Sequence, residues 1–215
     1  MLTPLAILFA VVGGAWGLVA DRIAVRWPEH DEEELPGGRA PGWRTAVTVV
    51  VGAAGLAAVP VRFAEPLQIA IFGAYVVALT LLLATDLDQR LLPNEITLLA
   101  IPIALVLVLA GLNPMVPPGA LLVTAGIALA VPLVLAVIAI PFGAGAIGQG
   151  DLKLLVSVGL MAGGWRLIVG VIDGCLLAGV VIVALLFARR ITLHSFIPYG
   201  PFLIIGAFWG LLGPG

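Results

Sequence analysis

Residues 71–86 read IFGAYVVALTLLLATD, an apolar run in which the first charged residue is the terminal Asp86. The run lies in a stretch, Leu67–Asp86, of the length that a helix needs to cross a membrane, which is about 20 mostly apolar residues. The whole chain has this character, since 62% of its 215 residues are apolar and only 10% are charged. A water-soluble domain carries about 25% charged residues. The composition therefore predicts an integral membrane protein.

Seven further apolar runs flank this one, so the predicted fold is all-α, a polytopic membrane bundle of about eight helices. The sixth run is short and begins beside charged residues, so it either tilts or lies deep among the other helices. If the sixth and seventh runs act as one broken unit, seven spans remain. The eight expected spans are Leu5–Val25, Trp43–Val59, Leu67–Asp86, Asn94–Leu112, Gly119–Ile140, Leu152–Gly163, Leu167–Phe187 and Ile197–Leu212.

The basic residues predict the orientation of the bundle, because loops that face the cytoplasm carry an excess of Lys and Arg. With the N-terminus outside, only Arg62 and Arg166 fall on the outer side. The other eight fall on the inner side: Arg22, Arg26, Arg39, Arg44, Arg90, Lys153, Arg189 and Arg190. This asymmetry also favours an even number of helices.

Composition excludes several other classes of protein. The net charge of −2 and the scattered basic residues exclude a nucleic-acid surface, and the single Cys175 excludes an internal disulfide or a cysteine-based zinc site. Met1 to Ala20 contain no Lys or Arg, unlike an export signal, and are predicted to be a retained helix. Residues 1–215 are expected to form a single domain with a short acidic loop at about 28–42.

Carboxylates at the edge of an apolar span are costly and indicate function. Asp86 ends the third predicted span and Asp151 opens the sixth, so the predicted topology places both at the cytoplasmic face. An aspartyl hydrolase needs such a pair: one carboxylate takes a proton from water, and the other stays protonated to polarise the scissile carbonyl. Asp86 lies near a helix C-terminus and Asp151 at a helix N-terminus, which predicts that Asp86 holds the proton and Asp151 is the base.

The residues around Asp151 support a site. Gly148 and Gly150 permit close backbone approach and unusual φ angles beside it. Lys153 points away from Asp151 on a helix, so it is expected to reach the membrane interface or to support the site electrostatically. We expect no metal site.

Three other polar residues receive structural interpretations. Asp88 is expected to be solvated, because two residues on a helix separate it from Asp86 by nearly half a turn. Asn94 is expected to cap the helix that it opens. Asp173 is expected to bond within the bundle, nearer the outer face.

These motifs resemble those of the type IV prepilin peptidase family, bacterial membrane aspartyl peptidases of the GxGD class. The first motif reads TDLDQRLLPNEITLL at residues 85–99, and the second reads GQGDLKLL at residues 148–155. IPYGPFLIIGAF at residues 197–208 and GLVADRIAVRWP at residues 17–28 are similar to further family signatures. The resemblance implies that Asp86 and Asp151 are the catalytic residues.

The resemblance also implies a substrate, a prepilin or pseudopilin whose basic leader is cut after a Gly preceding an apolar helix. It implies a location in the bacterial inner membrane, with cleavage on the cytoplasmic side. Many family members carry two CxxC pairs in the first loop, associated with methylation by S-adenosylmethionine, and this chain has none. No cofactor is expected for the peptidase step, and S-adenosylmethionine only if methylation is retained.

Several alternatives stay open at this stage. Asp151 is compatible with a helix N-cap and Asp86 with a solvated loop. A small proton- or cation-coupled transporter would also use membrane carboxylates, although such sites usually lie near the midplane with repeat symmetry, and no repeat is visible. A silent assembly factor that binds pilin helices and a related GxGD peptidase with another substrate are the remaining candidates.

Overall fold

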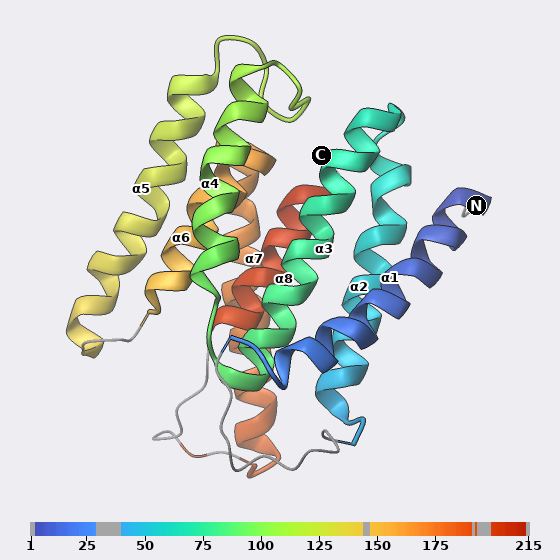
Figure 1. The fold of residues 1–215 in the computed structure, drawn as a ribbon. Coiled ribbons are helices and arrows are strands. Elements are labelled where there is room, and N and C mark those ends of the chain that lie inside the picture. The colour runs from blue at the N-terminus through green and yellow to red at the C-terminus, as the bar shows by residue number, and fades with distance from the viewer. Residues whose placement is uncertain (1–2, 29–39, 144–146, 191, 193–198, 214–215) are drawn as a thin grey trace.

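The computed structural model of the protein describes residues 3–28, 40–143, 147–190, 192 and 199–213. Within these ranges the chain forms eight α-helices, one short 3-10 helix and no strand (Figure 1). The predicted all-α bundle is thereby confirmed. The α-helices are α1 Pro4–Ala24, α2 Trp43–Arg62, α3 Pro66–Gln89, α4 Asn94–Leu109, α5 Leu121–Ala139, α6 Gln149–Ala162, α7 Gly164–Phe187 and α8 Gly200–Leu212, and the 3-10 helix η1 is Ile140–Phe142.

Successive helices run in opposite directions, so that the N- and C-terminal ends of the bundle both point to its upper part in Figure 1. We call the opposite end, where α3 ends and α6 and α8 begin, the lower end. α6 and α7 are separate helices that meet at Gly163, whose φ of 89° only a glycine adopts readily. The expectation of eight helices is therefore correct.

Helix boundaries differ from the predicted ones where polar residues extend a helix beyond its apolar run. α3 continues past Asp86 to Gln89, and Arg90 ends it in the left-handed conformation with a φ of 56°. Asp86 consequently lies inside the last turn of a helix, so the solvated-loop interpretation is wrong. The predicted start of the last span at Ile197 falls outside the described residues, and α8 is described from Gly200.

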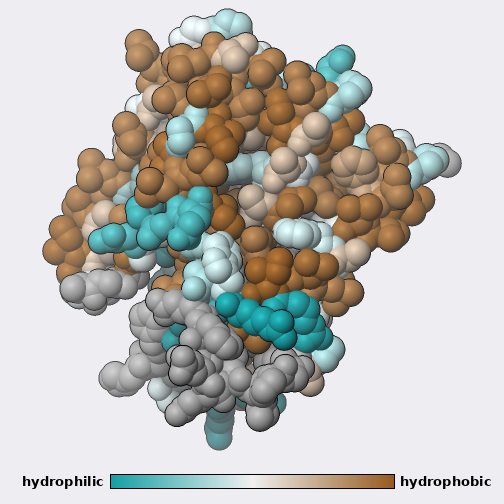
Figure 2. Space-filling model, in the orientation of Figure 1, coloured by the Kyte–Doolittle hydropathy of each residue, from teal (hydrophilic) through white to brown (hydrophobic). Residues whose placement is uncertain are grey.

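The outer surface of the bundle is apolar. Five helices are long and apolar enough to cross a membrane, namely α1, α2, α3, α5 and α7, and α4 and α8 are shorter apolar helices. Large side chains such as Leu122 and Phe187 are 84% and 85% exposed. Figure 2 shows this apolar surface over most of one face, with polar residues gathered toward the lower end. The chain is a multi-pass membrane protein.

The fourteen-residue helix α6 lies inside the bundle. Eight of its residues are buried, and it packs against α4, α5, α7 and α8. A helix surrounded by other helices does not need to match the thickness of the bilayer. The shortness of the sixth run therefore reflects a central position, which was one of the two predicted explanations.

Close contacts between glycines fix α8 against α7. A Cβ at Gly206 would overlap the carbonyl oxygen of Gly170, and a Cβ at Gly174 would lie 2.7 Å from the carbonyl oxygen of Phe202. Small residues allow helix backbones to approach in this way within membranes. The position of the first turn of α8 is thus set by backbone contact rather than by adjustable side chains.

The basic residues divide between the two ends as the sequence predicts. Arg62 and Arg166 lie at the upper end, in the last turn of α2 and the first turn of α7. Arg39 falls outside the described residues. The lower end carries the other seven: Arg22, Arg26, Arg44, Arg90, Lys153, Arg189 and Arg190.

Candidate active site

Asp86 is placed by the last turn of α3, at the lower end of the bundle. The residue is buried, with 5% of its surface exposed, and its carbonyl oxygen accepts a 3.0 Å hydrogen bond from the N–H of Arg90. The neighbouring Thr85 is fully buried and donates its hydroxyl to the carbonyl of Leu82. The carboxylate of Asp86 therefore enters the interior from a regular, closed helical turn.

Asp151 is placed by the first turn of α6. The N–H of Gly148, the residue that precedes the helix, donates a 3.3 Å hydrogen bond to Oδ2 of Asp151. A carboxylate in the first turn of a helix also lies at the positive end of the helix dipole. Gly148 is the N-cap of α6 and Asp151 is the third residue of the helix, so the N-cap interpretation of Asp151 is wrong. One of its two oxygens accepts the bond from Gly148, and the other remains available.

The two carboxylates meet beside Gly200, the first residue of α8. A Cβ built on Gly200 would overlap Oδ2 of Asp86 and lie 3.0 Å from Oδ1 of Asp151. Both oxygens are therefore within 3.0 Å of one point, and they are no more than twice that distance apart. These same two oxygens, Oδ2 of Asp86 and Oδ1 of Asp151, are buried and have no hydrogen-bond partner among the described residues.

The two predicted glycines act differently from one another. Gly148 has an ordinary φ of −68°, so the expectation of an unusual backbone conformation is wrong at this position. Gly150 makes the predicted close approach, because a Cβ there would lie 2.7 Å from Cβ of Leu92. Leu92 belongs to the turn between α3 and α4. The first turn of α6 thus packs directly on the turn that follows Asp86.

Lys153 strengthens the same junction. Its Nζ donates a 2.7 Å hydrogen bond to Oδ1 of Asn94. Asn94 is the first residue of α4, and Pro93 is the residue that precedes the helix, so the prediction that Asn94 caps α4 is wrong. Lys153 does not pair with Asp151, in agreement with the helical spacing. Lys153 supports the site by joining α6 to α4 through this hydrogen bond.

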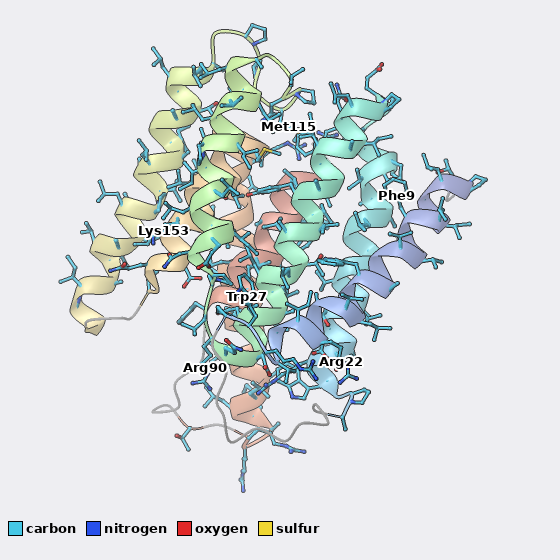
Figure 3. All side chains as sticks on the ribbon, viewed as in Figure 1. Phe9, Arg22, Trp27, Arg90, Met115 and Lys153 are labelled. Atoms are coloured by element: carbon cyan, nitrogen blue, oxygen red, sulfur yellow. The ribbon has the colours of Figure 1, made fainter. Side chains whose placement is uncertain are left out.

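Asp88 is not solvated, contrary to the prediction. Its side chain is 10% exposed and forms an ion pair with Arg44 in the first turn of α2. The next residue, Gln89, donates a 2.7 Å hydrogen bond to the carbonyl oxygen of Ala24 at the end of α1. The last turn of α3, which carries Asp86, is therefore held by both preceding helices. Arg22, Trp27 and Arg90 lie at the same end of the bundle (Figure 3).

A further buried carboxylate was missed in the sequence. Asp21 is 4% exposed in α1, and its Oδ2 accepts a 2.8 Å hydrogen bond from the hydroxyl of Thr45 in α2. The signal was present, because Asp21 interrupts the apolar run of the first span as Asp86 ends that of the third. Its oxygen is satisfied by a hydroxyl, which suits a structural contact between α1 and α2.

Asp173 lies apart from this site. It is half-buried in the upper half of α7 and makes no hydrogen bond or ion pair with any described residue, so the expected bond within the bundle is absent. Two of the three singled-out carboxylates are thus brought together, and the third is not.

The two juxtaposed carboxylates can act together as an acid and a base. Two carboxylates that share a buried space hold one proton between them, since two adjacent negative charges out of water repel strongly. Such a pair presents one acid and one base to a bound group. Over the described ranges, no three His, Cys, Asp or Glu side chains are grouped so that they could hold a metal ion.

The chain matches the sequence model of a known protein family. The sequence model of the type IV leader peptidase family matches residues 73–211, which is more than half of the chain and includes both aspartates. Neither a curated protein nor a solved structure matches the chain. The match begins within α3 and ends within α8, and so contains every helix that contributes to the carboxylate pair. This chain belongs to the type IV leader peptidase family.

Proposed function

We propose that this chain is an aspartic endopeptidase in which Asp86 and Asp151 are the catalytic pair. The observation that carries the proposal is the placement of their two unpartnered oxygens around one point beside Gly200. Buried carboxylate oxygens normally have hydrogen-bond partners. Two that lack them, at the same point and on different helices, are arranged to bind something that the protein itself does not supply.

The proposed reaction uses the two carboxylates in different roles. One oxygen of Asp151 is already held by the Gly148 N–H. The other takes a proton from a water molecule while the oxygen of that water attacks the scissile carbonyl carbon. Asp86 gives its proton to the carbonyl oxygen. The C–N bond of the tetrahedral intermediate then breaks, the leaving nitrogen takes the proton from Asp151, and Asp86 regains a proton from the hydroxyl group. The pair ends as it began.

The proposed substrate is a type IV prepilin or pseudopilin, cut after the Gly that precedes its apolar helix. Family membership supports this class of substrate. The carboxylate pair lies at the end of the bundle that carries seven of the nine described basic residues. We infer from the positive-inside rule that this end faces the cytoplasm and that the N-terminus lies outside. Family membership supports a location in the bacterial inner membrane. A basic leader on the cytoplasmic side would then reach the pair.

No cofactor enters the proposed hydrolysis, since both proton transfers are made by the aspartates. S-adenosylmethionine is required only if the chain also methylates the new N-terminus. Most of the acidic loop predicted at about 28–42 falls outside the described residues. Methylation is a separate activity, to be measured on the cleaved product.

The proposed function is tested by leader cleavage in membranes with wild type, Asp86→Asn and Asp151→Asn. Asn keeps the size of the side chain and removes the proton chemistry. Each variant should lose at least about 100-fold in kcat, the effect of losing a general acid or base. Asp173→Asn is the matched control, because it removes a membrane carboxylate away from the pair, and it should cleave as wild type does.

Retained cleavage in both Asn variants would overturn the assignment of the pair. If the wild type cleaves none of several prepilins, proton or cation transport by the same carboxylates is the function to measure next. A wild type that cleaves no prepilin points to the transporter alternative, whereas Asn variants that still cleave point to a peptidase with other catalytic residues.

A further inference from the structure

The first turn of α8 is the third element of the carboxylate site. Gly200 opens α8, a helix of thirteen residues, and is itself buried. The first turn of α8 is hydrogen-bonded, since the N–H groups of Phe202 and Leu203 both donate to the carbonyl oxygen of Tyr199. The positive end of a second helix dipole, in addition to that of α6, therefore lies against the pair.

An independent observation shows what this turn faces. Asp86 is more than nine-tenths buried, its Oδ2 has no partner among the described residues, and an atom at the point that a Cβ of residue 200 would occupy would overlap this oxygen. Oδ1 of Asp151 is 3.0 Å from the same point and is also unpartnered. The hydrogen that Gly carries in place of a side chain is thus the surface that both free oxygens share.

α8 cannot withdraw to make room for a larger residue. The glycine contacts between α7 and α8 bring the two backbones together over successive turns, at Gly170 with Gly206 and at Gly174 with Phe202. A side chain at position 200 would have to displace the carboxylates instead. The positions of the two free oxygens therefore depend on the identity of residue 200.

We propose that Gly200 is a positioning residue for the aspartate pair. Because it has no side chain, the first turn of α8 forms a wall that both free oxygens face closely, and this wall fixes where the two carboxylates lie relative to a bound water molecule or peptide carbonyl. The inference rests on the proposed peptidase function for its effect on cleavage. The wall itself rests only on the contacts described above.

A packing role alone predicts a different behaviour. Gly206 is a packing glycine, and a methyl there would strike the backbone of α7. Gly206→Ala should therefore lower stability without a specific effect on the carboxylates. Gly200→Ala should act on the carboxylates themselves, since the nearest atoms to its methyl are those of Asp86 and Asp151.

The experiment compares Gly200→Ala with Gly179→Ala, a helical glycine in α7 at which an added Cβ meets no atom within 4 Å. Cleavage of a detergent-solubilised prepilin should lose about 100-fold in kcat for Gly200→Ala, as expected for a misplaced reacting group, with KM little changed. Gly179→Ala should match wild type. Cleavage by Gly200→Ala within threefold of wild type would overturn the proposal.

A second readout needs no substrate. Infrared difference spectra across a pH titration report the protonated carboxyl group of the pair, identified by its loss in Asp86→Asn and in Asp151→Asn. Gly200→Ala should shift this band or its midpoint, and Gly179→Ala should leave it unchanged. An unshifted band in Gly200→Ala would contradict the proposal. If the band shifts but the wild type cleaves no prepilin, the function is wrong and the wall assignment stands.

Stability measurements cover the case in which Gly200→Ala does not fold. The clash of the added methyl is with Asp86, so Asp86→Ala should relieve it. The double variant Gly200→Ala with Asp86→Ala should be as stable as Asp86→Ala alone, and a double-mutant cycle should show strong coupling. Additive effects of the two substitutions would refute the contact on which the proposal depends.

Discussion

Lys153 on α6 donates a 2.7 Å hydrogen bond to Asn94 on α4, and this bond joins the two sequence segments that supply the aspartates. Lys153 is two residues after Asp151, and Asn94 follows the turn in which Leu92 packs on Gly150. The two contacts hold the first turn of α6 against the end of α3. The separation of the carboxylates is therefore set by a junction outside the pair itself.

Loss of this bond should weaken cleavage without removing either catalytic group. Lys153→Met keeps the length and apolar stem of the side chain, and Asn94→Ala removes the acceptor. Each should lower the free energy of unfolding by about 1 kcal/mol, the typical net value of one hydrogen bond. Cleavage should fall about tenfold, since displacement of a reacting group costs rate. Kinetics and unfolding in detergent measure both effects.

A double variant tests whether the two residues act together. Lys153→Met combined with Asn94→Ala should be no worse than either alone, because both remove the same bond. Asn94→Asp is the matched control, since it keeps an oxygen acceptor and should preserve cleavage. Independent, additive losses would show that Lys153 acts through the charge that it places near Asp151.

The ion pair between Arg44 and Asp88 should stabilise the turn that carries Asp86. Asp88→Asn removes the charge of a side chain that is 10% exposed, while its partner Arg44 is 35% exposed and partly screened by solvent. We expect a loss of about 1 kcal/mol in unfolding free energy, at the upper end for accessible pairs. Cleavage should fall because the last turn of α3 loosens.

Glu65→Gln is the control for this pair, because Glu65 precedes the same helix at its other end and makes no capping hydrogen bond. Its unfolding midpoint should equal that of wild type in a thermal scan. An Asp88→Asn variant as stable and active as the control would mean that Gln89 and its bond to Ala24 hold the turn alone.

The helices and the pair of aspartates could be predicted because each depends on a local pattern. An apolar run of the required length fixes a span, and a carboxylate at its edge is conspicuous whatever its surroundings. Alternation of eight antiparallel helices then brings the end of α3 and the start of α6 to one end of the bundle. No knowledge of helix rotation is needed for that step.

The contacts that position the pair could not be predicted in this way. Asp88 pairs with Arg44, and Asp21 with Thr45, only because α1, α2 and α3 cross with particular faces together. Asparagine is common both at helix caps and in hydrogen bonds between helices, so the residue type of Asn94 does not predict which of the two it makes. The role of Gly200 depends on the approach of a third helix, and a glycine in an apolar segment carries no local sign of what it faces.

The pH dependence of cleavage should be bell-shaped if the pair works with one shared proton. At low pH both carboxyl groups are protonated and the base is lost, and at high pH both are ionised and the acid is lost. Each limb of kcat/KM should therefore fall about tenfold per pH unit, the behaviour of a single essential proton. The two inflections belong to the pair rather than to either residue. A profile with one inflection only would exclude the acid–base division of labour proposed for Asp86 and Asp151.

Gly150 gives the most direct test of the junction between α6 and the turn after α3. A methyl at this position would lie 2.7 Å from Cβ of Leu92, so Gly150→Ala should cost about 1–3 kcal/mol through overpacking and lower cleavage. Leu92→Ala should restore part of both in the double variant, because it removes most of the side chain that the methyl strikes. Gly126→Ala is the control, since an added Cβ there meets no atom within 4 Å. Gly126 lies within α5, and alanine has a higher helix propensity than glycine, so this substitution should leave stability unchanged or raise it. Equal effects of Gly126→Ala and Gly150→Ala on unfolding in detergent would show that the contact with Leu92 does not set the position of Asp151.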